Sequence, residues 1–353
     1  MTALTVPARP EEDTSLRPVP WRRMAWVTWR QHRIALAGVA VFFGVLAVCL
    51  WLAGRQLHHA YAAAIAACQP ANSLACPNMV IAFDGTNGFL ANGFILQAVP
   101  VLIGAFVGAP VLAREMETGT FRYAWTQGFG RWRWALAKLV LLAVTVAAAA
   151  GVFSLLLSWY YQPYFAAGNQ AVSLTEMTPF FPGLFDLRGI GFAAWTLAAF
   201  AIGALAGMLI RRVVPAIAAT LVAYAGLAFA TGGWLRPAYM TPVVTSNLNV
   251  PGSAWIISQW WTKGGRFAFA GFPPAHLLEQ FCPAGPPGAV GPGGKPKAVA
   301  LAQCLAPHGY TQWTSYQPAS RFWAFQWIES GWLLALSVLL IAVTVWLVRR
   351  RAA

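Results

Sequence analysis

Six long stretches of this 353-residue chain contain no Asp, Glu, Lys, Arg or His. Each has about the 20 apolar residues that an α-helix needs to cross a bilayer of roughly 30 Å. Inside lipid the backbone must satisfy its own hydrogen bonds, so such stretches form spanning helices. The alternative, the buried helices of one large soluble domain, would have to explain six such lengths in one chain. The stretches are 34–53, 95–113, 139–161, 189–210, 213–235 and 330–348.

The sequence therefore predicts an all-α polytopic membrane protein with six transmembrane helices. The composition agrees, because 58% of the residues are hydrophobic and only 10% are charged, whereas about 25% are charged in soluble domains. A net charge of +14 would also suit a nucleic-acid-binding protein. The charges, however, are gathered in the short connections between the apolar stretches, which favours a membrane protein and no nucleic-acid partner.

The distribution of basic residues predicts the topology. Sixteen of the 24 Lys and Arg residues fall in 63 residues of short segments, and the other eight are spread over 166 residues of longer connections. The basic segments are 1–33, 114–138, 211–212 and 349–351. The sparse connections are 54–94, 162–188 and 232–329. The positive-inside rule then places both termini and the basic loops in the cytoplasm, and the three sparse loops outside.

The segment before the first span has two parts. Residues 1–20 are rich in Pro and charge, which predicts a disordered cytoplasmic tail, and the full-length apolar stretch that follows indicates an uncleaved anchor. Residues 21–33 (WRRMAWVTWRQHR) place Trp and apolar residues on one side of a helix and three Arg on another. This pattern predicts an amphipathic helix in the inner interface. The alternative is a basic segment that flanks the first span without forming a distinct helix.

The five cysteines give a further indication of topology. Cys49 lies in the first span and is expected to be a small buried apolar residue. Cys68 and Cys76 lie in the first outer loop, and Cys282 and Cys304 in the third, where disulfides can persist. We expect disulfides within each loop, although pairing across the two loops is also open. No CxxC or His/Cys cluster has zinc spacing, so no metal site is expected.

The third outer loop, 232–329, is long enough to fold outside the membrane. Its middle, 283–297, is a Pro/Gly-rich linker. The aromatic stretches 254–261 and 313–327 on either side either dip into the outer leaflet or pack as a cap, and the sequence does not decide between the two.

The connection 114–138 contains the pattern with the most functional content. Thr118 is a candidate N-cap for a short helix that runs to Gln127. Phe121 and Trp125 would then share one face and form an exposed apolar knob, and two acids precede it. Such a knob is what the groove of a partner protein could bind. The alternative is a solvated turn held by local ion pairs.

This connection resembles the coupling loop of type-2 (ABC-2-type) ABC-transporter permeases. The matching pattern is E-x-E-x-G-T-ϕ-x-x-x-x-T-Q-(x)₃-R-x-x-ϕ-x-x-x-K, after a span that contains Pro100 and Pro110. Segments 29–33 and 108–115 are similar to those of actinobacterial members. The resemblance implies six spans preceded by an amphipathic helix, with the loop between spans two and three inserted into an ATPase. Carried over by motif, the ATPase-coupling residues are Glu115, Glu117, Gly119, Thr120, Phe121, Trp125, Gln127, Arg131 and Lys138.

The resemblance also implies partners and a location. The chain would pair with a second permease, identical or paralogous, and with two ABC ATPase subunits that bind ATP and Mg²⁺, in the lipid bilayer of a bacterial plasma membrane. The chain itself would hold no cofactor and would not be an enzyme. No P-loop of the form GxxxxGK[ST] is present, and the nearest string, 291–296, has Pro after its Lys.

In the resembled family the translocation pathway lies between the two permeases and is lined by spans two and five. Candidate pathway residues are therefore Gln97, Phe106, Thr220, Tyr224 and Phe229, and ordinary helix packing is the alternative for each. This apolar, aromatic lining suits export of a hydrophobic or amphipathic cargo.

Two other functions compete with this one. An ion-coupled secondary transporter normally has Asp, Glu or His within the membrane, and the six stretches have none. A membrane-anchored assembly or sensory component without transport is the third possibility. Gly203 and Gly207 form a GxxxG pattern in the fourth stretch, which we assign to helix packing.

Overall fold

The computed structural model describes residues 21–67, 93, 95–119, 131–170, 178–247, 250–251, 253–282 and 298–351. Six helices in this part of the chain are long and apolar enough to cross a membrane, which confirms the predicted number of spans. They cover Leu36–Ala63, Ala98–Thr118, Trp132–Pro163, Gly191–Ile210, Val213–Ala238 and Ala319–Arg350.

Several spans are built from more than one helical segment. The first and third are the long helices α1 (Trp21–Ala67) and α6 (Arg131–Gln170). The second joins α3 (Ala98–Ile103), the π-helical η1 (Gly104–Gly108) and α4 (Ala109–Thr118). After the short α7 (Pro182–Phe185) come α8 (Gly191–Ile210) and then α9 (Val213–Ala230), the π-helical η2 (Thr231–Leu235) and α10 (Arg236–Ala238). The last span is η5 (Ala319–Arg321) followed by α13 (Phe322–Arg351).

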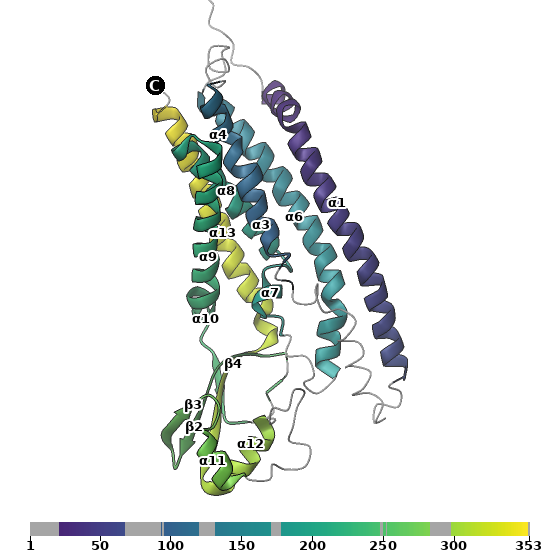
Figure 1. Cartoon of the computed structure of the whole chain (residues 1–353), viewed down its shortest axis with the longest axis vertical. Helices are drawn as coiled ribbons and strands as arrows, with labels where there is room; N and C mark the ends of the chain where they lie inside the picture. The colour runs from purple at the N-terminus through teal and green to yellow at the C-terminus, as the bar shows by residue number, and fades with distance from the viewer. Residues whose placement is uncertain are drawn as a thin grey trace, which may run out of the picture.

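Helix α8 lies at the centre of the bundle. It packs against η1 and α4, α6, α9 and α13, and it is the most buried of the six spans. Helix α1 packs on α6 at one edge, and α9 lies at the other edge (Figure 1). Most of the surface of α1 and α9 is exposed, so lipid or another protein must cover these two helices.

Four glycines allow the second span to approach α8 closely. A Cβ atom added at Gly203 would overlap the carbonyl oxygen of Gly104, and one at Gly207 would overlap that of Ala109. Gly104 and Gly108 on η1 are equally close to the backbone of α8. The packing role assigned to the GxxxG pattern is therefore confirmed, and the helices meet backbone to backbone as small residues permit in membranes.

We expect Gly203→Ala to destabilise the bundle by about 1–3 kcal/mol, the usual cost of overpacking. Gly226→Ala is the matched control, because nothing lies within 4 Å of a Cβ built on this glycine of α9. Thermal unfolding in detergent measures the difference. Equal unfolding midpoints for the two variants would contradict the close approach.

The two π-helical segments share one local cause. In each case a proline, Pro110 or Pro237, stands two residues after the π-helical turn, and the residue just before the proline donates its backbone N–H to the carbonyl five residues back. Proline has no N–H, and its ring collides with the carbonyl four residues earlier. The wider π-helical turn relieves this collision, and such turns are frequent at functional sites.

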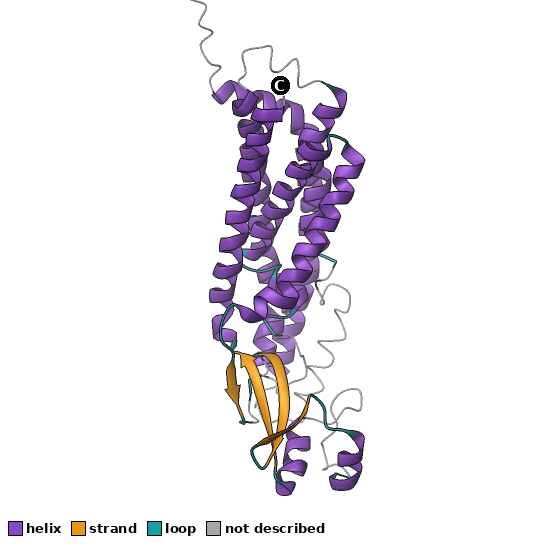
Figure 2. Cartoon of the chain, turned by 90° about the vertical axis from the view of Figure 1, so that its left-hand side faces the viewer, coloured by secondary structure: helices purple, strands orange, loops and turns teal. Residues whose placement is uncertain are grey.

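A small antiparallel sheet extends from one end of the bundle. Its strands are β1 (Val243–Thr245), β2 (Trp255–Lys263), β3 (Arg266–Ala270) and β4 (Tyr310–Gln317), in the order β1-β4-β2-β3. Helices α11 (Ala275–Phe281) and α12 (Ala298–Leu305) accompany it, followed by η4 (Ala306–His308). We call this end of the bundle the sheet end, and the opposite end, where α4 and α13 finish and α1 and α6 begin, the loop end (Figures 1 and 2).

The sheet corrects the all-α prediction. The aromatic stretch 254–261 largely becomes β2, and 313–327 is divided between β4 and α13, so this loop forms a cap rather than isolated membrane-dipping segments. The hairpin between β2 and β3 turns at Gly264 and Gly265, which both have positive φ. A Gly-Gly pair between aromatic and β-branched runs is a hairpin signal, so the sequence did contain a strand pattern.

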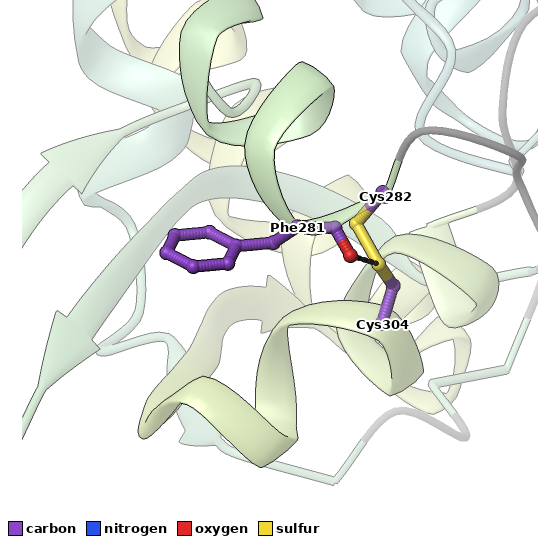
Figure 3. The surroundings of a disulfide bond; sticks show 3 residues. All are labelled: Phe281, Cys282 and Cys304. Carbon is purple, nitrogen blue, oxygen red and sulfur yellow. Dashed lines mark hydrogen bonds between the residues drawn. A yellow bond between two sulfur atoms is a disulfide. The ribbon is translucent and has the colours of Figure 1, made fainter.

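A disulfide stabilises the cap. Cys282, just after α11, is bonded to Cys304 in α12, with the two Cα atoms 6.0 Å apart (Figure 3). The Phe281 carbonyl oxygen lies 3.1 Å from Cys304 Sγ. A disulfide sulfur has no hydrogen to donate, so this approach is a packing contact. The pairing expected within 232–329 is confirmed, whereas Cys68 and Cys76 lie outside the described residues.

The first span differs from the expectation in two respects. Residues 21–33 form the first turns of α1 without a break, and their location in the inner interface stays a prediction. Cys49 is exposed, because the side of α1 that packs on the bundle is the one with Phe43, Leu50 and Leu57. Cys49 precedes Leu50 by one position and therefore points about 100° away from that side.

Candidate functional site

At the loop end, α4 is joined to α6 by an ion pair. Lys138 Nζ donates a hydrogen bond to Glu115 Oε1. The lysine side chain is only 1% exposed, and its ammonium group also lies over the Trp134 ring, 5.2 Å from the ring centroid. A buried ammonium group without a partner is costly, so this pair fixes α6 against the last turns of α4.

The neighbouring acid joins α4 to α9. Glu117 Oε2 accepts a 3.1 Å hydrogen bond from the backbone N–H of Val213, the first residue of α9. The first N–H groups of a helix have no partner within the helix, and a negative charge there is favourable. The two carboxylates therefore hold the end of α4 to two different spans.

Helix α4 ends within the motif that resembles a coupling loop. Gly119 adopts a left-handed conformation at the helix C-terminus, with φ of 71°, which only glycine adopts readily. The hydroxyl of Thr118 donates back to the Arg114 carbonyl oxygen at 2.8 Å. Thr118 thus closes α4 and is not the first residue of a new helix, contrary to its assignment as an N-cap.

The coupling residues are only partly within the described residues. Glu115, Glu117 and Lys138 lie at the junction of α4, α6 and α9. Gly119 ends α4, and Arg131 is the first residue of α6. The members of the expected knob lie outside the described residues, together with their neighbours in the motif: Thr120, Phe121, Trp125 and Gln127. The carboxylates of Glu115 and Glu117 are engaged within the chain, with Lys138 and with the backbone of Val213.

The structure divides the five candidate pathway residues between two environments. Thr220 is fully buried and donates to the Ala216 carbonyl oxygen, and Tyr224 packs against Trp195. Phe106 and Phe229 are exposed, at 62% and 80%. Gln97 is half-buried and donates to the Pro182 carbonyl oxygen.

Spans two and five nevertheless lie side by side. Helix α9 packs against η1 and α4. Thr220 and Tyr224 belong to the packing within the chain, whereas Phe106 and Phe229 are free to meet lipid, cargo or another protein.

At the sheet end the structure reveals a buried ion cluster that the sequence analysis missed. Arg236 donates from Nε to Glu329 Oε2 at 2.9 Å and from Nη2 to Glu329 Oε1 at 2.7 Å. The same Nη2 also donates to Asp186 Oδ1. Arg236 and Glu329 are 3% and 1% exposed, so this is a two-bond pair removed from water, the geometry in which Arg binds carboxylates most strongly.

Aromatic side chains complete the cluster. The indole N–H of Trp195 donates to Glu329 Oε1 at 2.9 Å and to Asp186 Oδ1 at 3.2 Å. The Tyr239 hydroxyl donates to Glu329 Oε2 at 3.3 Å and accepts from Trp332 Nε1 at 2.9 Å. The cluster thus joins the sheet ends of α8, α10 and α13 with the turn after α7.

Two carboxylates share one guanidinium group in this cluster. Burial raises the pKa of the Asp186 carboxyl to about 8, an effect that the Arg236 guanidinium opposes and the Glu329 carboxylate reinforces. The cluster therefore has no surplus of positive charge, and Arg236 is its only cation among the described residues.

Exposed tryptophans indicate where the cluster lies relative to a bilayer. Trp327 and Trp346 on α13 are 66% and 49% exposed, and the helical rise between them is about 28 Å, close to the roughly 30 Å of a hydrocarbon core. Tryptophan prefers the two membrane interfaces. Glu329, two residues from Trp327, then lies near one boundary of the bilayer and is enclosed by protein.

A signal for this cluster was present in the sequence. Arg236 and Glu329 each stand one residue beyond an apolar stretch, and Asp186 stands three residues before another. Charges were counted only inside the stretches, whereas the helices continue past them and include Arg236 and Glu329. The argument against ion-coupled transport was that the six apolar stretches contain no acids. The helices are longer than these stretches, and the last of them contains Glu329.

The model of one protein family, described as ABC-2 membrane transporter related, matches residues 39–236. The match begins within α1 and ends at Arg236. It therefore includes the junction of α4, α6 and α9 and leaves out the sheet and α13. No curated protein and no solved structure matches the chain.

Proposed function

The chain belongs to the ABC-2 membrane transporter related family, and we propose that it is the permease subunit of an ABC transporter, exporting a hydrophobic or amphipathic cargo with the energy of a separate ATPase. It is a multi-pass membrane protein and a transmembrane component of such a transporter. An ABC ATPase partner follows in general from membership of the family. The docking site, the cargo, the direction and the stoichiometry are our proposals.

One observation supports the assignment of the docking site most strongly. The last turn of α4 is bonded to α6 through Glu115 and to α9 through Glu117. Residues 119–130 connect α4 to α6, two of the three spans that these contacts tie together. A partner that moves this loop moves α4, α6 and α9 at once, which is what a coupling loop must accomplish.

The exposed faces of spans two and five support an apolar cargo and a second permease. Phe106 and Phe229 face outward, as do Val214, Val222 and Trp234 on the fifth span. A second copy or a paralogue facing this surface would complete a translocation pathway lined by apolar and aromatic groups. Cargo with a large apolar surface would gain from such a lining.

One observation favours the alternative of an ion-coupled transporter, namely the acids of the buried ion cluster. Glu329 and Asp186, however, have carboxylate oxygens already bonded by Arg236, Trp195 and Tyr239. They also lie at the sheet end of the spans and not midway across them. This arrangement suits a structural cluster better than a relay for protons, so we keep the ATPase-driven function.

The proposal requires the loop end to be cytoplasmic and the sheet to lie outside the cell. A cysteine introduced at Gly128 should react with a membrane-impermeant thiol reagent only in inside-out vesicles. Phe267→Cys, at a 68% exposed position on β3, is the matched control and should react in intact cells. The unsubstituted chain gives the background from native cysteines. Labelling of Gly128→Cys in intact cells would reject the proposed orientation.

A further inference from the structure

The fifth span has an unusual set of attachments. Most of its surface is exposed, and among the residues of α9 only Ala216 and Thr220 are fully buried. Each of its ends, by contrast, is held by a charged side chain: Glu117 at Val213 and Arg236 at Glu329 and Asp186. A helix with little buried surface along its length and charged contacts at both ends is suited to moving as one piece.

At the loop end the attachment is to the coupling loop itself. Glu117 lies two residues before Gly119, where α4 ends. Its carboxylate bonds the first amide of α9, and Ala109 and Ala113 of α4 pack directly on Ala216. Contacts between alanines leave little side chain to deform, so displacement of the end of α4 is passed on to α9.

At the sheet end the attachment is to the spans that support the cap. Arg236 follows η2 and bonds Glu329 of α13. Four residues after Arg236, the Met240 carbonyl accepts a hydrogen bond from Gln317 at the end of β4, and the Thr241 carbonyl accepts one from Arg321. The end of the fifth span is therefore tied to both chain segments that enter and leave the sheet.

We propose that Glu117 and Arg236 make the fifth span, Val213–Ala238, a strut that carries movement of the coupling loop to the outer ion cluster and the cap. This inference rests on the proposed function, because the movement originates in the bound ATPase. Glu117 is a positioning residue in this scheme: it touches neither ATP nor cargo, and it acts through the N-terminus of α9. The span is about 39 Å long as a helix, enough to connect the two sides of a bilayer.

The test uses the complex of the full chain with its ATPase. Spin labels on unnatural amino acids at 234 and 52, exposed positions on η2 and on α1, which packs on α6 at the other edge of the bundle, leave the native cysteines unlabelled. In the wild type, the distance between the labels should shift when ATP is trapped in the ATPase. Glu117→Ala should abolish the shift in complexes that contain the ATPase. Glu117→Gln should preserve it, because the amide oxygen can still accept from Val213.

A second variant breaks the same contact from the other side. Val213→Pro removes the N–H donor at the first position of α9, where proline is well tolerated. Arg212, the residue before it, is already extended, with φ of −130° and ψ of 134°, as a residue preceding proline requires. Val213→Pro should therefore fold and should lose the shift as Glu117→Ala does.

Three results would overturn the strut. They are a shift that survives both variants, the absence of any shift in the wild-type complex, and loss of the ATPase from Glu117→Ala, which would make Glu117 a docking contact. Failure of the wild-type chain to bind any ATPase is distinguishable from these, and it would overturn the proposed function together with the strut.

Discussion

Arg236→Ala should lower the free energy of unfolding by about 3–5 kcal/mol, the usual effect of removing one partner from a buried ion pair. The substitution leaves Glu329, 1% exposed, and Asp186 without their shared cation. Arg236→Lys should recover only part of the loss, because an ammonium group cannot reproduce the two bonds to Glu329 from Nε and Nη2. Thermal unfolding in detergent and abundance in the membrane measure the effect.

Two controls separate lost pairing from lost charge. Arg266→Ala removes an exposed arginine from β3 and should change the unfolding midpoint little. The triple variant Arg236→Met, Glu329→Gln, Asp186→Asn removes all three ionisable groups and should be more stable than Arg236→Ala alone, since no uncompensated charge stays buried. An Arg236→Ala protein as stable as the wild type would show that the cluster does not hold the spans together.

Phe121→Ala combined with Trp125→Ala should detach the ATPase and leave insertion and folding intact. Truncating an aromatic anchor at the centre of an interface typically costs about 2 kcal/mol or more of binding free energy, and neither side chain belongs to a span. The ion pair between Glu115 and Lys138 should persist in the double variant, since it lies within the bundle. Co-purification of the ATPase, measured with permease abundance, gives the result.

The matched control for the double variant is Trp323→Ala with Trp327→Ala. These two tryptophans are also exposed, at 56% and 66%, but lie at the sheet end of α13. Their substitution should affect how α13 is positioned in the membrane, and it should not change the amount of ATPase that co-purifies. If the knob variant retains its ATPase with undiminished yield, residues 119–130 are not the docking element.

Much of the membrane domain could be predicted from the sequence because the bilayer imposes a simple length rule on apolar residues. Six charge-free stretches therefore predicted six spans, and their order along the chain was correct. The rule says little about where each helix ends. Helices α1 and α6 continue well past their apolar stretches, because polar residues at a membrane boundary can extend a helix as well as end it.

The contacts between spans could not be predicted in the same way. Glu115 and Lys138 were both in the coupling motif, but their pairing depends on how α4 packs on α6. The link between Glu117 and Val213 joins residues 96 positions apart. The cluster around Arg236 likewise brings together segments separated by 50 and 93 positions. Tertiary packing decides such contacts, and no local pattern determines them.

The cap shows a different limit. Its strands were not predicted, because the aromatic stretches suited membrane contact and packing as a cap equally well. The Gly264-Gly265 turn and the alternation in β4, where Tyr310 and Gln312 are buried and Thr311 is exposed, pointed to a hairpin and a half-buried strand. The disulfide between Cys282 and Cys304 was accessible from the sequence, since both cysteines lie in one loop on the side predicted to be oxidising.

The central claim is that this chain is a permease that works through a separate ATPase. The most direct test compares ATP hydrolysis by the purified chain alone with hydrolysis by the complex that co-purifies from its native membrane. The account predicts no hydrolysis by the isolated chain, hydrolysis by the complex, and loss of that activity from preparations of the Phe121→Ala, Trp125→Ala variant. Robust ATP hydrolysis by the isolated polypeptide, or cargo movement driven by a pH gradient alone, would contradict it.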